Sequence, residues 1–146
     1  ATGMVGGQSL DFEAVGEKLT LEQLEQMHKL KTGALIRCAV LLGGMSAGSA
    51  SESQMNALAD YADNIGLAFQ VQDDILDVTS DTSQLGKPQG SDSGANKPTY
   101  LSLLGLDAAR AKADELAQQA TAALRDFDES ADPLRQLAHF IVARLH

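Results

Sequence analysis

Three carboxylates occur within nine residues, in the stretch FQVQDDILD at residues 69–77. In a helix, residues three, four or seven positions apart share a face, so Gln70, Asp73, Asp74 and Asp77 would form one polar stripe. Carboxylates held this close repel one another, and a proton or a divalent cation relieves the repulsion. Mg²⁺ typically binds one or two carboxylates together with waters and phosphate oxygens. The stripe therefore predicts a Mg²⁺ site for a phosphate-containing ligand.

An acidic stripe can also be an ordinary solvated helix face, and this remains the alternative interpretation. The neighbouring residues favour a site, because the run IGLAFQV at residues 65–71 and the pair Ile75 and Leu76 are mainly apolar. A helix with such flanks is expected to line a cavity rather than to face open water.

The rest of the chain predicts helices that could position the stripe. Its 146 residues have the length of one domain, 44% of them are hydrophobic and only 4% are aromatic. A core built from Leu, Ala, Ile, Val and Met favours helices, and no strand-like alternation runs through the chain. The expected fold class is all-α, a helical bundle.

Helix starts are marked by two pairs with capping-box spacing, Thr20 with Gln23 and Ser51 with Gln54. Glycines 43 and 44 are expected to stop the second helix. Apolar spacing completes the assignment, and the five expected helices cover about residues 2–14, 20–43, 51–78, 107–127 and 132–145.

One long loop is expected between the third and fourth helices. Residues 80–98 are rich in glycine, serine, proline and asparagine, which interrupt helices. Loops of this length in compact domains are usually functional or disordered.

Charge and composition limit the partners. Eleven basic and twenty acidic residues give a net charge of -9, which disfavours nucleic acid and anionic membrane surfaces. The chain has no run of about eighteen apolar residues, so no membrane insertion is expected. The single cysteine, Cys38, is expected to be a small buried residue, and a cytoplasmic location fits its reduced thiol.

Four motifs in order resemble those of trans-polyprenyl diphosphate synthases, most closely the bacterial farnesyl and short-chain geranylgeranyl types. They are GMVGGQSLDF at 3–12, MHKLKTGALIRCAV at 27–40, FQVQDDILD at 69–77 and LGKPQGSD at 85–92. The resemblance covers nearly the whole chain. It implies a class I isoprenoid synthase fold, with residues 1–146 as its C-terminal half. The family's first aspartate-rich motif and isopentenyl-diphosphate-binding arginines belong to the other half.

The resemblance also implies roles for individual residues. Asp73, Asp74 and Asp77 match the acids of the family's Mg²⁺ site, in which the first acid coordinates the metal and the others support its shell mostly through water. Asp73, Asp74 and Lys31 are the expected catalytic residues. The expected diphosphate contacts are Lys31, Thr32, Gln70, Lys87 and Lys97, Phe69 would border the isoprenoid cavity, and Gln8 and Asp11 would lie behind the ligand contacts.

Each of these residues also has a purely structural interpretation. Lys31 could be a surface charge, and Thr32 could bond to its own helix. Lys87 and Lys97 adjoin prolines and could simply order the loop. Gln8 and Asp11 could be buried polar neighbours, and Phe69 could be a core residue.

The implied reaction is the Mg²⁺-dependent head-to-tail condensation of an allylic diphosphate with isopentenyl diphosphate. The chain alone is expected to be inactive without the missing N-terminal half, and the resemblance implies a homodimer. The alternatives are a noncatalytic helical interaction or regulatory subunit and a class I terpene cyclase, of which the lysine segment favours the synthase over the cyclase.

Overall fold

The structure is a computed structural model that describes residues 3–14, 16, 19–79 and 98–144. Every regular element in these ranges is helical, which confirms the all-α fold class. In chain order the elements are α1 (Met4–Glu13), α2 (Leu21–His28), the π-helix η1 (Lys29–Gly33), α3 (Ala34–Ser46), α4 (Glu52–Thr79), α5 (Tyr100–Leu104), α6 (Leu106–Ala123), the 3₁₀-helix η4 (Glu129–Ala131) and α7 (Asp132–Ala143).

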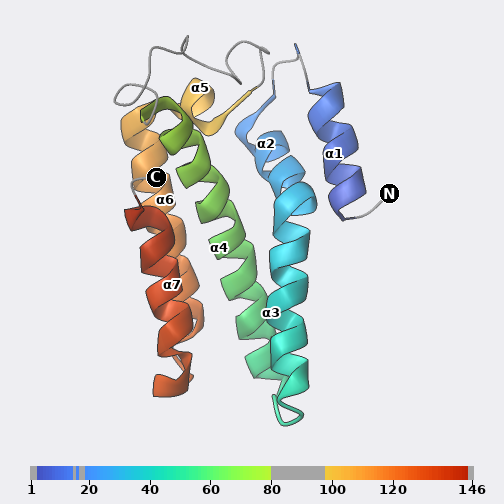
Figure 1. Cartoon of the computed structure of the whole chain (residues 1–146), viewed down its shortest axis with the longest axis vertical. Coiled ribbons are helices and arrows are strands. Elements are labelled where there is room, and N and C mark those ends of the chain that lie inside the picture. Colours follow the sequence, from blue (N-terminus) through green and yellow to red (C-terminus); the bar gives the residue numbers. More distant parts are fainter. Residues whose placement is uncertain (1–2, 15, 17–18, 80–97, 145–146) are drawn as a thin grey trace.

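Helix α4 is the central element of the bundle. It lies between the continuous rod formed by α2, η1 and α3 on one side and the pair α6 and α7 on the other (Figure 1). Helix α1 packs beside α2 and η1, and the short α5 contacts α2, α4 and α6 near the C-terminal end of α4. The C-terminal half of α4, which carries the acidic stripe, therefore meets several other elements.

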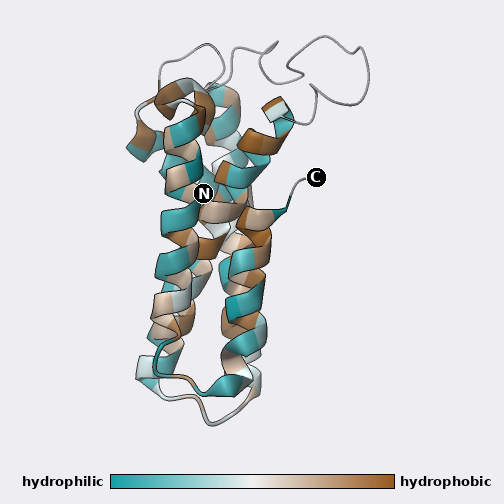
Figure 2. Cartoon of the chain, turned by 90° about the vertical axis from the view of Figure 1, so that its left-hand side faces the viewer, coloured by the Kyte–Doolittle hydropathy of each residue, from teal (hydrophilic) through white to brown (hydrophobic). Residues whose placement is uncertain are grey.

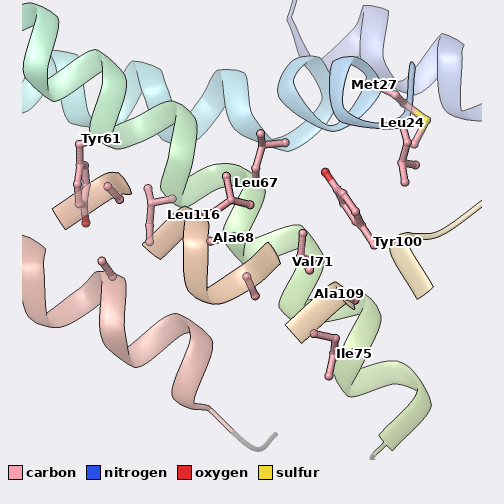
Figure 3. Close-up of a cluster of buried hydrophobic side chains, with 14 of the residues drawn as sticks. Leu24, Met27, Tyr61, Leu67, Ala68, Val71, Ile75, Tyr100, Ala109 and Leu116 are labelled. Atoms are coloured by element: carbon pink, nitrogen blue, oxygen red, sulfur yellow. The ribbon is translucent and has the colours of Figure 1, made fainter. Parts of the chain in front are cut away.

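Small and aliphatic residues hold α4 against its neighbours. Ala62, Ala68 and Val71 of α4 have no exposed surface, and alanines on α6 allow the two helices to approach closely. Figure 3 shows Tyr100 of α5 in the same buried cluster, near Leu24 of α2. Full burial of a leucine side chain such as that of Leu24 contributes roughly 1.5–3 kcal/mol to the stability of the fold. The core therefore joins α2, α4, α5 and α6.

Both predicted capping boxes are present. The Gln23 side chain accepts from Thr20 N at 2.8 Å, and Thr20 Oγ1 accepts from Gln23 N at 3.3 Å. Ser51 and Gln54 make the equivalent pair at 2.9 and 3.2 Å, directly before α4. These bonds satisfy N–H groups that a helix start leaves without acceptors.

The expected end of the second helix was wrong. The rod contains the π-helix η1 and continues through Gly43 and Gly44 to Ser46. A Cβ at Gly44 would lie 2.7 Å from the side chain of Leu58 and 2.9 Å from that of Met55. Glycine therefore serves close packing of α3 on α4 at this position rather than helix termination.

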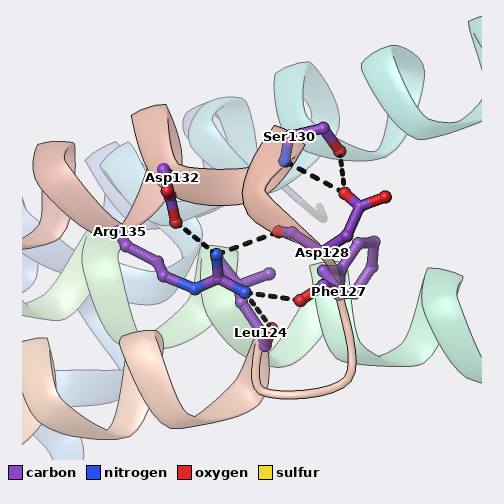
Figure 4. Close-up of polar contacts among 6 residues, drawn as sticks. All are labelled: Leu124, Phe127, Asp128, Ser130, Asp132 and Arg135. Carbon is purple, nitrogen blue, oxygen red and sulfur yellow. Dashed lines mark hydrogen bonds and ion pairs between the residues drawn. The ribbon is translucent and has the colours of Figure 1, made fainter.

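The fourth expected helix also ends early, at Ala123 rather than near Phe127. Figure 4 shows the guanidinium of Arg135 filling the turn between α6 and α7. It donates to the backbone oxygens of Leu124, Phe127 and Asp128 at 2.7, 2.8 and 3.0 Å and to Asp132 Oδ1 at 2.6 Å. These bonds satisfy carbonyls that the shorter helix leaves without donors.

Several apolar side chains remain on the surface of the described residues. Figure 2 shows hydrophobic and hydrophilic segments mixed along the helices. Large exposed apolar residues on α1 and α3 include Val5, Phe12, Leu35 and Met45. The expectation that Cys38 is buried was wrong, because the residue is exposed on α3.

Among the described residues, no helix combines the length and apolarity needed to cross a membrane.

Two buried tyrosines differ in how their hydroxyls are satisfied. Tyr61 Oη donates to Leu134 O at 2.9 Å, whereas Tyr100 Oη has no hydrogen-bond partner among the described residues. We expect Tyr61→Phe to lower the free energy of unfolding by about 1 kcal/mol and Tyr100→Phe to leave it unchanged or to raise it. Urea unfolding monitored by circular dichroism measures both values. Equal losses in the two variants would contradict the assignment.

Candidate functional site

A cavity of about 340 Å³ lies where α1, α2, η1 and α4 meet the segment that precedes α5. It brings together most of the site residues expected from the sequence, namely Asp11, Lys31, Thr32, Phe69, Gln70, Asp73, Asp74 and Asp77, with Met27, His28, Pro98 and Thr99 completing the lining. Lys87 and Lys97 lie outside the described residues. Gln8 is half-buried on α1 and is not among the lining residues.

The π-helix η1 presents the first part of the site. A π-turn inside an α-helical rod inserts an extra residue, and such turns often occur at functional sites. Here the turn contains both Lys31 and Thr32. A Cβ at Gly7 would lie 2.5 Å from Lys31 Cα, so only glycine allows α1 to approach this turn so closely.

Lys31 pairs with an acid from α1. Its Nζ lies 2.7 Å from Asp11 Oδ2, and the side chains are 33% and 9% exposed. A nearly buried carboxylate requires such a partner. Asp11 and Lys31 both line the cavity, so Asp11 lies in the cavity wall itself.

Thr32 faces α4 rather than its own helix. Its Oγ1 donates to Gln70 Oε1 across 38 residues of sequence, in a long hydrogen bond of 3.5 Å. The structure therefore brings Thr32 and Gln70 together at the cavity wall.

Asp73 pairs with a residue that sequence reasoning missed. Arg144 Nη2 lies 2.5 Å from Asp73 Oδ1, and the Arg144 guanidinium stacks 4.4 Å above the ring of Phe69. Gln72 Nε2 donates to Arg144 O at 2.9 Å and fixes the backbone after α7. No local pattern marks Arg144, because its partners lie about seventy residues earlier in the chain.

The other two acids differ from Asp73. Asp74 Oδ2 accepts a hydrogen bond from the backbone N of Tyr100 at 2.8 Å. Asp77 lies on the exposed side of the cavity rim. The three neighbouring carboxylates therefore have three different environments.

His28 is a second residue that the sequence did not single out. Its ring is stacked on Tyr100, with centroids 5.6 Å apart and planes inclined by 15°. Burial lowers the pKa of His28, and the nearby Gln70 amide and Asp11 offset this only in part. Neither ring nitrogen makes a hydrogen bond of normal geometry within the described residues. The imidazole is therefore a neutral part of the cavity wall.

The acidic side chains fit magnesium as one part of a larger ligand set. Within the described residues, no three acidic, histidine or cysteine side chains are grouped closely enough to hold a metal by themselves. Asp73, Asp74 and Asp77 nevertheless line one cavity with Lys31. Mg²⁺ usually keeps waters and binds phosphate oxygens beside one or two carboxylates. The donor set thus fits a metal whose shell an anionic ligand completes.

Comparison with known proteins identifies the family. A family model described as polyprenyl synthetase matches residues 1–137. The chain belongs to the polyprenyl synthetase family. This confirms the resemblance inferred from the four sequence motifs, and the all-α fold is that of this family.

Curated relatives of this polyprenyl synthetase chain are prenyl diphosphate synthases. It is 50% identical to farnesyl diphosphate synthase of Escherichia coli K12, over 97% of this chain and 48% of that protein. It is 44% identical to geranylgeranyl diphosphate synthase of Cyanophora paradoxa, over 98% of this chain and 48% of that protein. The chain thus spans about half the length of these relatives.

Solved structures of the polyprenyl synthetase family superpose well on the chain. A putative farnesyl-diphosphate synthase from Marinomonas sp. MED121 gives a TM-score of 0.81 at 42% identity, over 96% of this chain and 46% of that one. Geranyltransferase from Helicobacter pylori, complexed with magnesium and isoprenyl diphosphate, gives a TM-score of 0.76 at 32% identity, over 96% of this chain and 46% of that one.

The lowered pKa of His28 predicts a loss of stability on acidification. Because the folded pKa is below the ordinary value of 6.5, the unfolded state takes up the proton first as the pH falls below that value. We expect the melting temperature to fall more steeply with acidification below pH about 6.5 in the natural protein than in His28→Phe. Differential scanning fluorimetry across this range measures the slope.

The matched control is His139→Phe, because His139 is exposed on α7. This variant should keep the pH dependence of the natural protein. An unchanged slope in His28→Phe would show that another group causes the acid sensitivity.

Proposed function

We propose that the chain is the C-terminal half of a short-chain prenyltransferase of the farnesyl or geranylgeranyl diphosphate synthase type. The observation that carries the proposal is the convergence of Lys31 with Asp73, Asp74 and Asp77 on one cavity. Ammonium and metal-binding groups facing each other across a cavity suit a diphosphate, which carries several negative charges. The named relatives support this substrate class.

The proposed reaction is a head-to-tail condensation. The allylic carbon–oxygen bond breaks with its electron pair leaving on the diphosphate, the double bond of isopentenyl diphosphate supplies two electrons for the new carbon–carbon bond, and a proton is lost from the neighbouring carbon. Magnesium would stabilise the charge that develops on the departing diphosphate. No protein nucleophile is needed.

The residues of this chain would share the work of holding the diphosphate. Asp73 and Asp77 are proposed to reach magnesium, while one oxygen of Asp74 is already bonded to Tyr100 N. Lys31 would shift from Asp11 toward the diphosphate, where its positive charge stabilises the leaving group. Thr32 and Gln70 would add neutral hydrogen bonds, and Lys87 and Lys97 are proposed to add further positive charge.

The apolar part of the cavity would protect the developing carbocation. Phe69 and Met27 line the cavity beside the polar groups. An apolar wall excludes water, which would otherwise capture a cation before the second substrate attacks. The aromatic face of Phe69 is covered by the Arg144 guanidinium, which restricts the orientation of the ring.

The remaining half of the site is proposed to come from the N-terminal half of the same protein. The chain spans about half of its relatives, and α3 has no buried residue within this chain. Packing of the missing half against such a face would bury its apolar side chains. We propose that the chain alone is inactive and that the complete protein is a homodimer that requires Mg²⁺.

Ligand binding should clearly stabilise the full-length protein only when Mg²⁺ and a diphosphate-like anion are both present. We expect Mg²⁺ with inorganic diphosphate or a bisphosphonate to raise the melting temperature, and either component alone to have a much smaller effect. The reason is that the acids need the metal to attract phosphate oxygens. Differential scanning fluorimetry tests this with four samples: no addition, Mg²⁺ alone, the anion alone, and both together. A noncatalytic interaction domain would show no joint effect.

The acidic and basic sides of the site should both be required for catalysis. In the full-length protein, Asp73→Ala and Lys31→Ala are each expected to lower kcat for labelled isopentenyl diphosphate by about 100-fold or more, because charge stabilisation of the leaving group is lost.

Exposed residues on the same helices provide matched controls. Asp60→Ala on α4 and Lys29→Ala on η1 should retain near-normal turnover, since both side chains face solvent. A loss of less than about tenfold in Asp73→Ala would contradict the proposed role of the acidic motif.

A further inference from the structure

A backbone hydrogen bond joins the short helix α5 to the acidic helix α4. Tyr100 is the first residue of α5 after the capping residue Thr99. The capping box uses the N–H groups of Thr99 and Ser102, so it provides no acceptor for Tyr100 N–H. Asp74 Oδ2 accepts this hydrogen bond at 2.8 Å.

This hydrogen bond is partly buried. Tyr100 has no exposed surface and belongs to the central hydrophobic cluster. A buried N–H without an acceptor is strongly unfavourable, and an ionised acceptor gives a stronger hydrogen bond than a neutral one. Asp74 is therefore well suited to fix the start of α5 on α4.

The ring of Tyr100 extends this connection to the other side of the cavity. It stacks on His28, the last residue of α2. The next turn of the same rod is η1, which carries Lys31 and Thr32. A continuous path of contacts therefore leads from the acidic helix α4 through α5 to the turn that presents the lysine.

We infer that Asp74 is a positioning residue, which anchors Tyr100 through its backbone and thereby sets the turn that carries Lys31. Asp73 and Asp77 then supply the metal-binding oxygens, and here the inference rests on the proposed function. The two adjacent aspartates of one motif thus have different tasks. Asp74 acts within the protein, whereas Asp73 acts on the ligand.

The anchoring step is tested by hydrogen exchange of the Tyr100 amide in the full-length protein, without metal or ligand. In Asp74→Ala this amide should exchange about tenfold faster or more than in the natural protein, because its acceptor is removed. In Asp74→Asn the side-chain oxygen can still accept, so protection should remain closer to the natural level. An unchanged exchange rate in Asp74→Ala would overturn the anchoring role.

The division of tasks is tested by the Mg²⁺ concentration that gives half of the thermal shift at saturating inorganic diphosphate. Asp73→Asn should raise this concentration by about tenfold or more, whereas Asp74→Asn should raise it by less than about threefold. Equal increases in the two variants would overturn the inference, because Asp74 would then act as a metal ligand. Asp73→Asn and Asp74→Asn both keep the size and shape of the side chain. If Asp74→Ala does not fold, these two variants still show whether Asp74 binds the metal.

The path through the ring is tested by Tyr100→Leu, which keeps the backbone donor and an apolar side chain but removes the stacking on His28. The amide at position 100 should remain protected, while the diphosphate concentration for half of the thermal shift should rise several-fold. An unchanged diphosphate requirement would overturn the path to Lys31. The exchange measurement needs neither metal nor substrate, so its outcome is independent of whether the complete protein is a prenyltransferase.

Discussion

The site depends on holding several like charges on one face of α4 beside a buried core. Each charge near the core is stabilised by a different element of the fold. Asp73 is neutralised by Arg144 from the end of α7, and Asp74 accepts a backbone hydrogen bond from α5. Across the cavity, Lys31 is neutralised by Asp11 of α1. The requirement that partly buried charges have partners thus joins α1 to η1, and α5 and α7 to α4.

Internal pairing also explains how such a site can exist before a ligand binds. Asp73 and Lys31 are the groups proposed to act on a metal–diphosphate complex, and both have an internal counter-ion. Both side chains are also partly exposed, at 48% and 33%. For Asp73, exchange of partners costs little because water screens the charge, whereas Asp11, the partner of Lys31, is only 9% exposed and gains little from such screening. The ligand would therefore replace existing contacts rather than fill an uncompensated site.

Close backbone contacts determine where these groups lie. Gly7 allows α1 to approach the η1 turn. Gly66 of α4 lies so close to Gly33 of η1 that a Cβ on Gly66 would be 3.3 Å from the Gly33 Cα. Without these contacts, Asp11 could not reach Lys31 and Gln70 could not reach Thr32. On α3, in contrast, Leu35, Leu42 and Met45 are exposed, which agrees with the proposal that further protein covers this face.

The sequence by itself determined the fold class, both main helix starts and the acidic stripe, because each depends on residues within a few positions of one another. Capping boxes and the spacing of the acids are local features, and the motifs predicted that Lys31 would belong to the same site. The different partners of Asp73 and Asp74 were decided only by the tertiary structure. Arg144 and Tyr100 reach α4 from 71 and 26 residues away. The burial of His28 likewise depends on a distant segment, since its ring stacks on Tyr100, and no local pattern predicted the π-turn at η1.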